Sequence, residues 1–229
     1  MIGFRFAVVA ILLALALGFA RPSAAEPLEQ QILIDKAQLS IEAMMEDQTL
    51  EAMRTLIKNA KGIVIVPNLV KAGFILGAAG GSGVLMTRNV AKNDWSNPAF
   101  VDFGAASIGI QAGVQVSDLV LLVMTDNGLE ALLSNKVTLG AEAGLVVGTI
   151  GGEREAATTT NLDADIFAFS RSVGLFGGLS LEGGMLVADE EWNAAYYGRP
   201  VTTREIVLEQ AVSNPEAGGL RLALFKLSS

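Results

Sequence analysis

The sequence predicts an α+β fold, with N-terminal helices packed on a mainly antiparallel, strongly coiled or barrel-like Gly-rich sheet and short C-terminal helices. Three observations predict this class. Residues 28–59 place apolar side chains three or four positions apart, as amphipathic helices do. From residue 62 to residue 188, short apolar runs follow one another at hairpin spacing, which is typical of antiparallel strands. Many of those runs contain glycine, and the chain has 25 glycines, which favours bends and bulges over a flat sheet.

The first 25 residues have the features of a cleaved export signal. Arg5 is followed by fifteen almost wholly apolar residues, and Ser23 and Ala25 have the small side chains that a signal peptidase needs. We therefore expect cleavage after Ala25, one domain over residues 26–229, and a periplasmic or extracellular location with peripheral membrane association. The alternative is an uncleaved anchor, for which the apolar run falls short of the roughly 20 residues that span a bilayer. The chain has no cysteine, so an exported domain would be stabilised without disulfides.

The predicted helices come first along the mature chain. The periodic segment divides into helices over residues 28–46 and 49–59, because Asp47 or Thr49 can cap the second one. Gly62 follows a lysine-rich last turn and is expected to end that helix.

The most crowded glycines come next. Residues 62–67, "GIVIVP", predict a buried strand that ends at its proline. Residues 71–88, "KAGFILGAAGGSGVLMTR", match neither the G-x-x-x-x-G-K-[ST] phosphate-binding loop nor the G-x-G-x-x-G dinucleotide pattern. We expect these residues to form a hairpin that turns at Gly80 and Gly81.

Short strands and short helices alternate in the rest of the chain. Residues 117–125, "SDLVLLVMT", predict a central strand, and a short helix capped by Thr125 or Asp126 follows. Residues 163–188 predict a hairpin that turns at Val173-Gly174. The other expected elements are strands within 95–116 and 137–148, a helix over 189–198, a helix opened by the capping box Thr202-x-x-Glu205, and a helix or extended tail over 215–226.

The residue types exclude much enzyme chemistry. Without histidine or cysteine there can be no Ser-His-Asp triad, no cysteine nucleophile and no imidazole or thiolate metal site. We expect no catalytic residues, no metal and no cofactor. Asp163 and Asp165 leave a carboxylate-based hydrolase open as an alternative, although such a pair is more often a solvated turn.

The charge is distributed unevenly. The mature chain has 14 basic and 24 acidic residues, which argues against nucleic acid as a partner. Residues 52–93 hold six basic residues and no acid, which predicts an anion-binding face unless these side chains lie on different faces. The six are Arg54, Lys58, Lys61, Lys71, Arg88 and Lys92. The hairpin expected above would bring Lys71 and Arg88 together. Trp95 could lie among lipid headgroups or cover a hairpin edge.

Four segments, taken in order, resemble the SYLF domain family. They are "NAKGIVIVPNLVKAGFILG", "NPAFVDFGAASIGIQAGVQVSDLVLLVMT", "SRSVGLFGGLSLEGG" and "YYGRPVTTREI". The resemblance covers roughly residues 35 to 210. That domain is found in bacterial exported proteins and in eukaryotic membrane-trafficking and actin-patch proteins.

The resemblance implies a non-enzymatic, lipid-binding domain. Eukaryotic members bind phosphoinositides through basic residues and an amphipathic N-terminal segment, and some bind actin. Carried over to this chain, the resemblance assigns lipid binding to the N-terminal helical stretch and to Lys58, Lys61 and Lys71, with Arg88 following by position. Arg54, Lys92 and Trp95 complete the candidate lipid-binding set.

Two departures from the family change the expected ligand. No SH3 or FYVE module is attached, so adaptor roles are not carried over, and the export signal makes phosphoinositides and actin unexpected. An anionic phospholipid headgroup or membrane surface is therefore the expected partner, and an envelope protein is the alternative. Glutamate at Lys58, Lys61 and Lys71 together is expected to abolish co-sedimentation with anionic vesicles.

Overall fold

The computed structural model describes residues 29–73, 76–89, 94–108, 113–148, 164–173, 181 and 183–229. The α-helices in these ranges are α2 (Glu29–Glu46), α3 (Glu51–Leu56), α4 (Asp126–Leu132), α5 (Glu190–Tyr197), α6 (Thr203–Val207) and α7 (Gly218–Ser228). Short 3-10 turns are η1 (Gln48–Leu50), η2 (Ile57–Asn59) and η3 (Pro215–Ala217). The strands are β1 (Gly62–Gly73), β2 (Leu76–Asn89), β3 (Asp94–Trp95), β4 (Ala99–Ile108), β5 (Gly113–Val123), β6 (Lys136–Thr138), β7 (Leu145–Gly148), β8 (Ile166–Val173) and β9 (Met185–Ala188).

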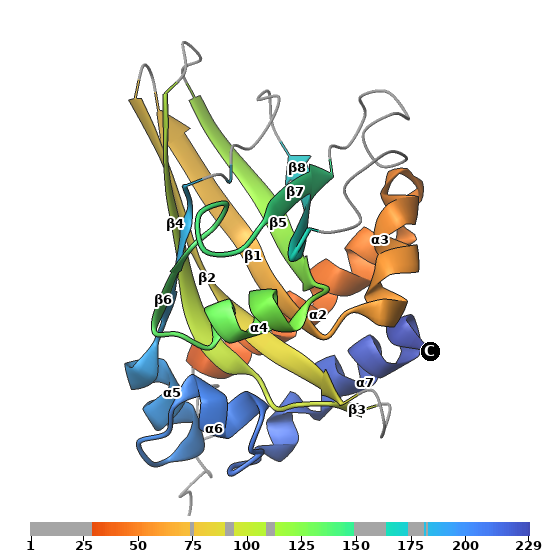
Figure 1. Ribbon diagram of the computed structural model, residues 1–229, viewed down its shortest axis with the longest axis vertical. Helices are drawn as coiled ribbons and strands as arrows, with labels where there is room; N and C mark the ends of the chain where they lie inside the picture. The colour runs from red at the N-terminus through yellow and green to blue at the C-terminus, as the bar shows by residue number, and fades with distance from the viewer. Residues whose placement is uncertain are drawn as a thin grey trace, which may run out of the picture.

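The strands form one curled sheet. In the described ranges its order is β6-β9-β4-β2-β1-β5-β8-β7, and β3 pairs with β2 beside this path. The pairings are antiparallel except for β7 with β8. The apolar strands β1 and β5 are central, as the sequence predicts. Together with the helices, this arrangement confirms the expected α+β class with a mainly antiparallel, coiled sheet (Figure 1).

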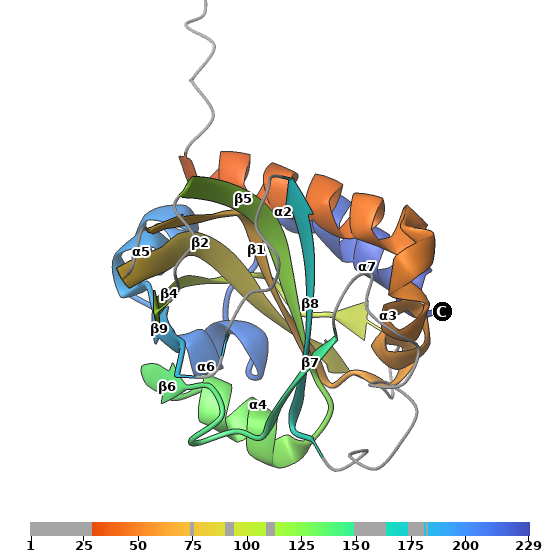
Figure 2. The ribbon, with the colours of Figure 1, turned by 90° about the horizontal axis from the view of Figure 1, so that it is seen from above.

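Each face of the sheet has its own core. On the convex face, Ile63, Ile65 and Val84 pack with apolar residues of α2, such as Ile34 and Ile41. On the concave face, residues from strands at both ends of the sheet meet in one cluster with α4, so the sheet curls around them. Seen from above, α2 and α7 lie on one side of the sheet and α4 on the other (Figure 2). The strands therefore read as near-continuous apolar runs where both faces are covered.

Local signals place most of the helices correctly. Thr125 caps α4 by accepting a hydrogen bond from the backbone N–H of Gly128. Thr202 and Glu205 form the predicted capping box at the start of α6. The two predicted N-terminal helices match α2 and the run of η1, α3 and η2, although the N-cap residue of α3 is Leu50.

The expected hairpin turn at Gly80 and Gly81 is wrong. Both glycines lie inside β2, which pairs with β1 from Gly62↔Thr87 to Gly73↔Gly77. Gly81 and Gly83 lie where the two strands approach closely, whereas a Cβ on Gly80 would meet nothing nearer than 3.7 Å. A Cβ on Gly83 would lie 2.5 Å from the backbone oxygen of Ile65, closer than real Cβ atoms come to other atoms. Glycine marks close backbone approach here, which is one of its known roles in strands.

The sequence predicts that Pro67 ends its strand, and this prediction is wrong. β1 continues to Gly73 through a β-bulge, seen as a shift of register between Val66 and Leu69. Asn68 takes a positive φ of 53° in the bulge. A bulge interrupts the ladder of hydrogen bonds, so a proline without an N–H is accommodated there.

The expected hairpin over residues 163–188 is also wrong. β8 pairs with β5 and β7, whereas β9 pairs with β4 and β6 near the other edge of the sheet. Alternation of apolar residues predicts that a segment is a strand, but it does not name the partner of that strand. The predicted turn at Val173-Gly174 reaches residue 174, which lies outside the described residues.

Candidate functional site

Three of the candidate cations meet at one end of the sheet. Lys58 and Lys61 directly precede β1, and Arg88 lies near the end of β2. The antiparallel register aligns Gly62 with Thr87, and the backbone N–H of Arg88 donates to the Lys61 carbonyl at 2.8 Å. We call Lys58, Lys61 and Arg88 the basic end.

The three side chains differ in how they are held. Lys58 is exposed on η2. The ammonium of Lys61 forms an ion pair with Asp126 at 2.7 Å. The Arg88 guanidinium donates to the carbonyls of Lys58 and Ser228, the latter at 2.9 Å. Two of the bonds of Arg88 thus go to neutral carbonyl groups, whereas Lys61 shares its charge with a carboxylate.

Arg54 has a structural position. Its guanidinium donates to the carbonyls of Met45 and Asp47, at 3.0 and 2.7 Å. These carbonyls lie at the end of α2, where backbone acceptors have no partner within the helix. Arg54 thus joins α3 to the end of α2, and its half-buried side chain is less available to a ligand than that of Lys58.

Lys71 lies far from the basic end. It is ten residues beyond Lys61 along β1 and has Ala79 and Gln115 as cross-strand neighbours. An extended strand rises about 3.3 Å per residue, so the two lysines are about 30 Å apart. The expectation that the hairpin brings Lys71 and Arg88 together is therefore wrong, because β1 and β2 stay paired as far as Gly73 and Gly77. Lys92 lies outside the described residues.

Trp95 is buried and is removed from the candidate ligand-binding set. Its side chain is 1% exposed, and its indole N–H donates to the Ser228 hydroxyl at 3.1 Å. It is the cross-strand neighbour of Arg88 and covers the end of the β2–β3 pairing, as the alternative interpretation expects. The ring therefore cannot reach a headgroup layer from this position.

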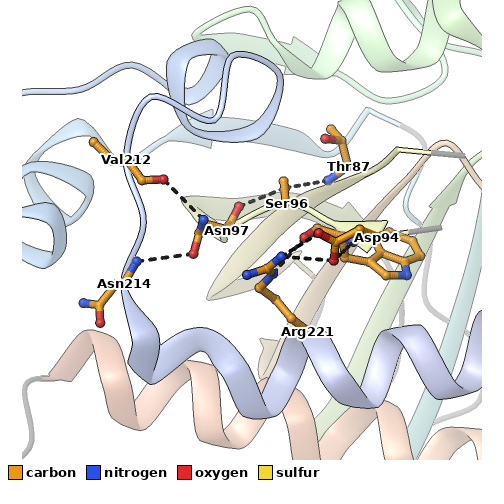
Figure 3. A network of polar contacts seen from close by, with 8 residues as sticks. Thr87, Asp94, Ser96, Asn97, Val212, Asn214 and Arg221 are labelled. Carbon is orange, nitrogen blue, oxygen red and sulfur yellow. Dashed lines mark hydrogen bonds and ion pairs between the residues drawn. The ribbon is translucent and has the colours of Figure 1, made fainter. Parts of the chain in front are cut away.

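A polar network around Trp95 fastens the C-terminal segment to the sheet (Figure 3). Arg221 of α7 binds both carboxylate oxygens of Asp94, at 3.0 and 2.8 Å, and donates to the Trp95 carbonyl at 2.8 Å. Asn97 donates to the Val212 carbonyl and accepts from the backbone N–H of Asn214. The last turn of α7 consequently lies against the basic end.

Sequence reasoning missed the part that α7 plays in this site. Ser228 accepts from Arg88, and the exposed Lys226 lies two residues before it. A basic residue in the last turn of an amphipathic helix was visible in the sequence. No local pattern, however, shows that residues some 130 positions apart come together.

Asp165 is a structural group. It accepts hydrogen bonds from the hydroxyl of Thr125, from the side chain of Asn127 at 3.1 Å and from the backbone N–H of Gly144 at 2.9 Å. The Thr125 bond, followed by the Gly144 bond, lowers the pKa of this carboxyl below its usual value. Asp165 is thus neither a solvated turn nor a general acid, and Asp163 lies outside the described residues.

The pKa shifts of Tyr196, Tyr197 and Glu205 move these groups away from neutrality. Burial raises the pKa of Tyr196 and Tyr197 far above neutrality, and hydrogen bonds from Thr202 lower the pKa of Glu205. A recess between α5 and α6 is lined by Glu190, Glu191 and Glu205 and so disfavours anions. No cluster of three potential metal-ligating residues occurs in the described part of the chain. None of its helices is both long and apolar enough to cross a membrane.

The fold and the site define an α+β domain with a curled antiparallel sheet, helices on its convex face and a cationic end. The model of the Ysc84 family, described as "Las17-binding protein actin regulator", matches residues 104–227. The chain belongs to this family, whose domain is also called SYLF, and the predicted resemblance is confirmed.

Curated relatives resemble a large part of the chain. SH3 domain-containing YSC84-like protein 1 of Bos taurus and of Homo sapiens are each 34% identical over 152 residues, which is 66% of this chain and 44% of the relative. LAS seventeen-binding protein 3 of Saccharomyces cerevisiae is 32% identical over 154 residues, which is 66% of this chain and 33% of the relative. This chain therefore matches less than half the length of these relatives, which are named for binding or for their domains.

Proposed function

We propose that this chain is a non-enzymatic, exported domain that binds reversibly to anionic phospholipid headgroups through its basic end. The observation that carries the proposal is that the backbones of Lys58, Lys61 and Arg88 come together at one end of the sheet, where Arg88 binds the carbonyls of Lys58 and Ser228. The absence of histidine and cysteine from the sequence supports a binding role over catalysis.

The charges set the expected strength of binding. A lysine or arginine near an anionic membrane contributes about 1 kcal/mol. Lys58 is exposed and should contribute most, whereas Arg88 is partly buried and Lys61 shares its charge with Asp126, so both should contribute less. Binding should therefore be weak and reversible, and raising the salt concentration should weaken it because exposed charges are screened within about 10 Å at 0.1 M.

A matched pair of variants tests the proposal. Lys58→Glu and Lys71→Glu make the same change of charge, but at positions about 30 Å apart along β1. Lys58→Glu is expected to weaken co-sedimentation with vesicles of phosphatidylglycerol and phosphatidylcholine about tenfold, since it removes one attraction and adds one repulsion. Lys71→Glu should bind as the parent does. Equal effects of the two variants would show that only net charge matters, and unchanged binding of Lys58→Glu would refute the site.

Export is a separate part of the proposal, supported by the N-terminal segment. Expression of the full sequence in a bacterium, followed by fractionation, should give a periplasmic or secreted protein whose mass spectrum shows Glu26 as its first residue. Recovery of the uncleaved chain from the membrane fraction would instead support an anchor.

A protein-binding role is the second candidate. It is favoured by the name of the yeast relative, a LAS seventeen-binding protein, and by a group of exposed apolar side chains on the sheet. A domain of this kind would remain at the bottom of a flotation gradient with anionic vesicles as well as with neutral ones.

A further inference from the structure

An exposed apolar face extends beyond the helix layer. On the convex side of the sheet, α2 covers the rows that contain Ile63, Ile65 and Val84. The strands β1, β2, β4 and β5 continue past these rows and past α2 (Figure 1). Five of the exposed large apolar side chains lie on this continuation and on β9 beside it, namely Val70, Val114, Val116, Met185 and Val187.

The strand register places these side chains side by side. One row runs across five neighbouring strands through Val116, Val70, Gly80, Gly104 and Met185. The next row outward contains Val114, Ala72, Ala78 and Ala106. Valines thus stand on β1 and β5, and glycines and alanines on β2 and β4. Met185 and Val187 stand on β9. We call these two rows, with Val187, the apolar sheet face.

One exposed carboxylate, that of Asp102, lies at the border of this face. Asp102 is exposed beside Val187 and accepts a hydrogen bond from Ser82 at 2.7 Å. Asp118 lies on the same side of the sheet, where Arg171 pairs with it at 3.4 Å. Lys71, between Val70 and Ala72 on β1, points to the opposite side because successive strand residues alternate. Because Arg171 balances Asp118, the negative charge at this border is that of Asp102, which disfavours an anionic membrane and favours a partner with a basic residue at that point.

The dimensions favour a small partner. Four strand spacings of about 4.8 Å and two or three rows give an area of roughly 300–400 Å². A stable protein–protein interface buries about 800 Å² on each partner, so a second copy would need contacts beyond these described rows to form a lasting dimer. An α-helix of about 10–13 residues is 15–20 Å long, which matches the length of the face along the strands.

We propose that the apolar sheet face binds a short amphipathic helix of another polypeptide, with small apolar residues toward Gly80 and Gly104 and basic residues beside Asp102. This inference goes beyond lipid binding at the basic end and does not depend on it. The chain itself provides the model for such packing, since α2 lies on the same side of β1 and β2 through Ile34 and Ile41. The glycines and alanines allow a helix to approach closely between the flanking valines and Met185.

Gly104→Leu is a sharp test of this packing. A Cβ on Gly104 meets no atom within 4 Å, so leucine can be added without disturbing the fold. The added side chain would occupy the floor on which the helix lies. It would also increase the apolar area, so that simple hydrophobic adhesion would become stronger. The variant therefore separates a fitted helix from a sticky surface.

The probe is a fluorescein-labelled helical peptide of about 14 residues with alanine and leucine on one face and lysine on the other, matched by a peptide with glutamate for lysine. Fluorescence anisotropy with the full mature chain should show binding of the lysine peptide, at least tenfold weaker binding to Gly104→Leu, and weaker binding to Asp102→Asn. Stronger or equal binding to Gly104→Leu, or preference for the glutamate peptide, would overturn the proposal. A complete lack of peptide binding would also overturn it. The same holds if light scattering shows that the unmodified chain is a dimer and that Gly104→Leu abolishes this dimer.

Discussion

Asp165→Asn should destabilise the domain in a pH-dependent way. The carboxylate accepts from the Thr125 hydroxyl, the Asn127 amide and the Gly144 N–H, and so ties β8 to the start of α4 and to the segment before β7. Hydrogen bonds to charged groups contribute about 1.5–3 kcal/mol each, less where solvent reaches them. An asparagine retains one acceptor oxygen, but its N–H₂ group would face the hydrogen-bond donors that now bind the second carboxylate oxygen. We therefore expect the free energy of unfolding to fall by about 2–3 kcal/mol at pH 7.

The direction of the pH dependence follows from the lowered pKa. A carboxyl whose pKa is lower in the folded state binds fewer protons there than in the unfolded chain. Its contribution is complete above the unfolded pKa of about 3.9 and is lost as the pH falls through the folded pKa. The difference between the parent and Asp165→Asn should therefore shrink below pH 4.

Urea denaturation of both proteins at pH 7 and at pH 3 measures this difference. At pH 7 the variant should also melt about 5–10 °C lower, since 1 kcal/mol corresponds to about 2–4 °C in a chain of this size. Equal midpoints at pH 7 would refute the structural role of Asp165. A stability difference that stays constant down to pH 3 would refute the assignment of the lowered pKa.

Two further substitutions test the packing of the sheet and of α7. Gly83→Ala should cost about 2–3 kcal/mol in urea denaturation, because its Cβ would lie 2.5 Å from the Ile65 oxygen. Gly104→Ala is the matched control and should change stability by less than about 1 kcal/mol; equal costs would contradict the close approach of β1 and β2. Arg221→Met should cost about 1–2 kcal/mol, since it removes a partly exposed ion pair with Asp94 and the bond to the Trp95 carbonyl. Hydrogen exchange in α7 should become faster, and unchanged exchange would show that apolar packing alone holds the helix.

The sequence predicts the class of this fold because its helix signals are local. The capping residues Thr125 and Thr202 and the apolar spacing of α2 each act within a few positions of the chain. Glycine is a weaker signal, because it marks both turns and close approach of strands. Gly80 and Gly81 suggest a turn. In the structure this glycine-rich segment is the part of β2 that lies beside the bulge in β1.

The error in the turn accounts for the error in the candidate site. Because β2 continues through Gly80 and β1 extends to Gly73, Lys71 lies at the end of the sheet opposite Arg88. The burial of Trp95 was equally hidden, because its partner Ser228 lies 133 positions along the chain. The charge block was recognisable in the sequence, but its division between two ends of the sheet depended on a register that residue type alone does not determine.

The two proposed surfaces should act independently. The basic end and the apolar sheet face lie toward opposite ends of β1 and β2. Asp102 pairs with Ser82, six residues from Arg88 along β2, so the two charges are about 20 Å apart, which is more than twice the screening length of about 8 Å at physiological salt. Charges at Lys58 and Arg88 therefore cannot assist a helix beside Asp102, and a membrane at one end leaves the other end exposed. We expect the lysine peptide to bind the vesicle-bound domain as tightly as the free domain, within about twofold. Fluorescence anisotropy of the labelled peptide measures this, with vesicles chosen so that they do not bind the peptide themselves. Competition between vesicles and peptide would show that they share one surface, and it would reject the separation that the register of β1 and β2 predicts.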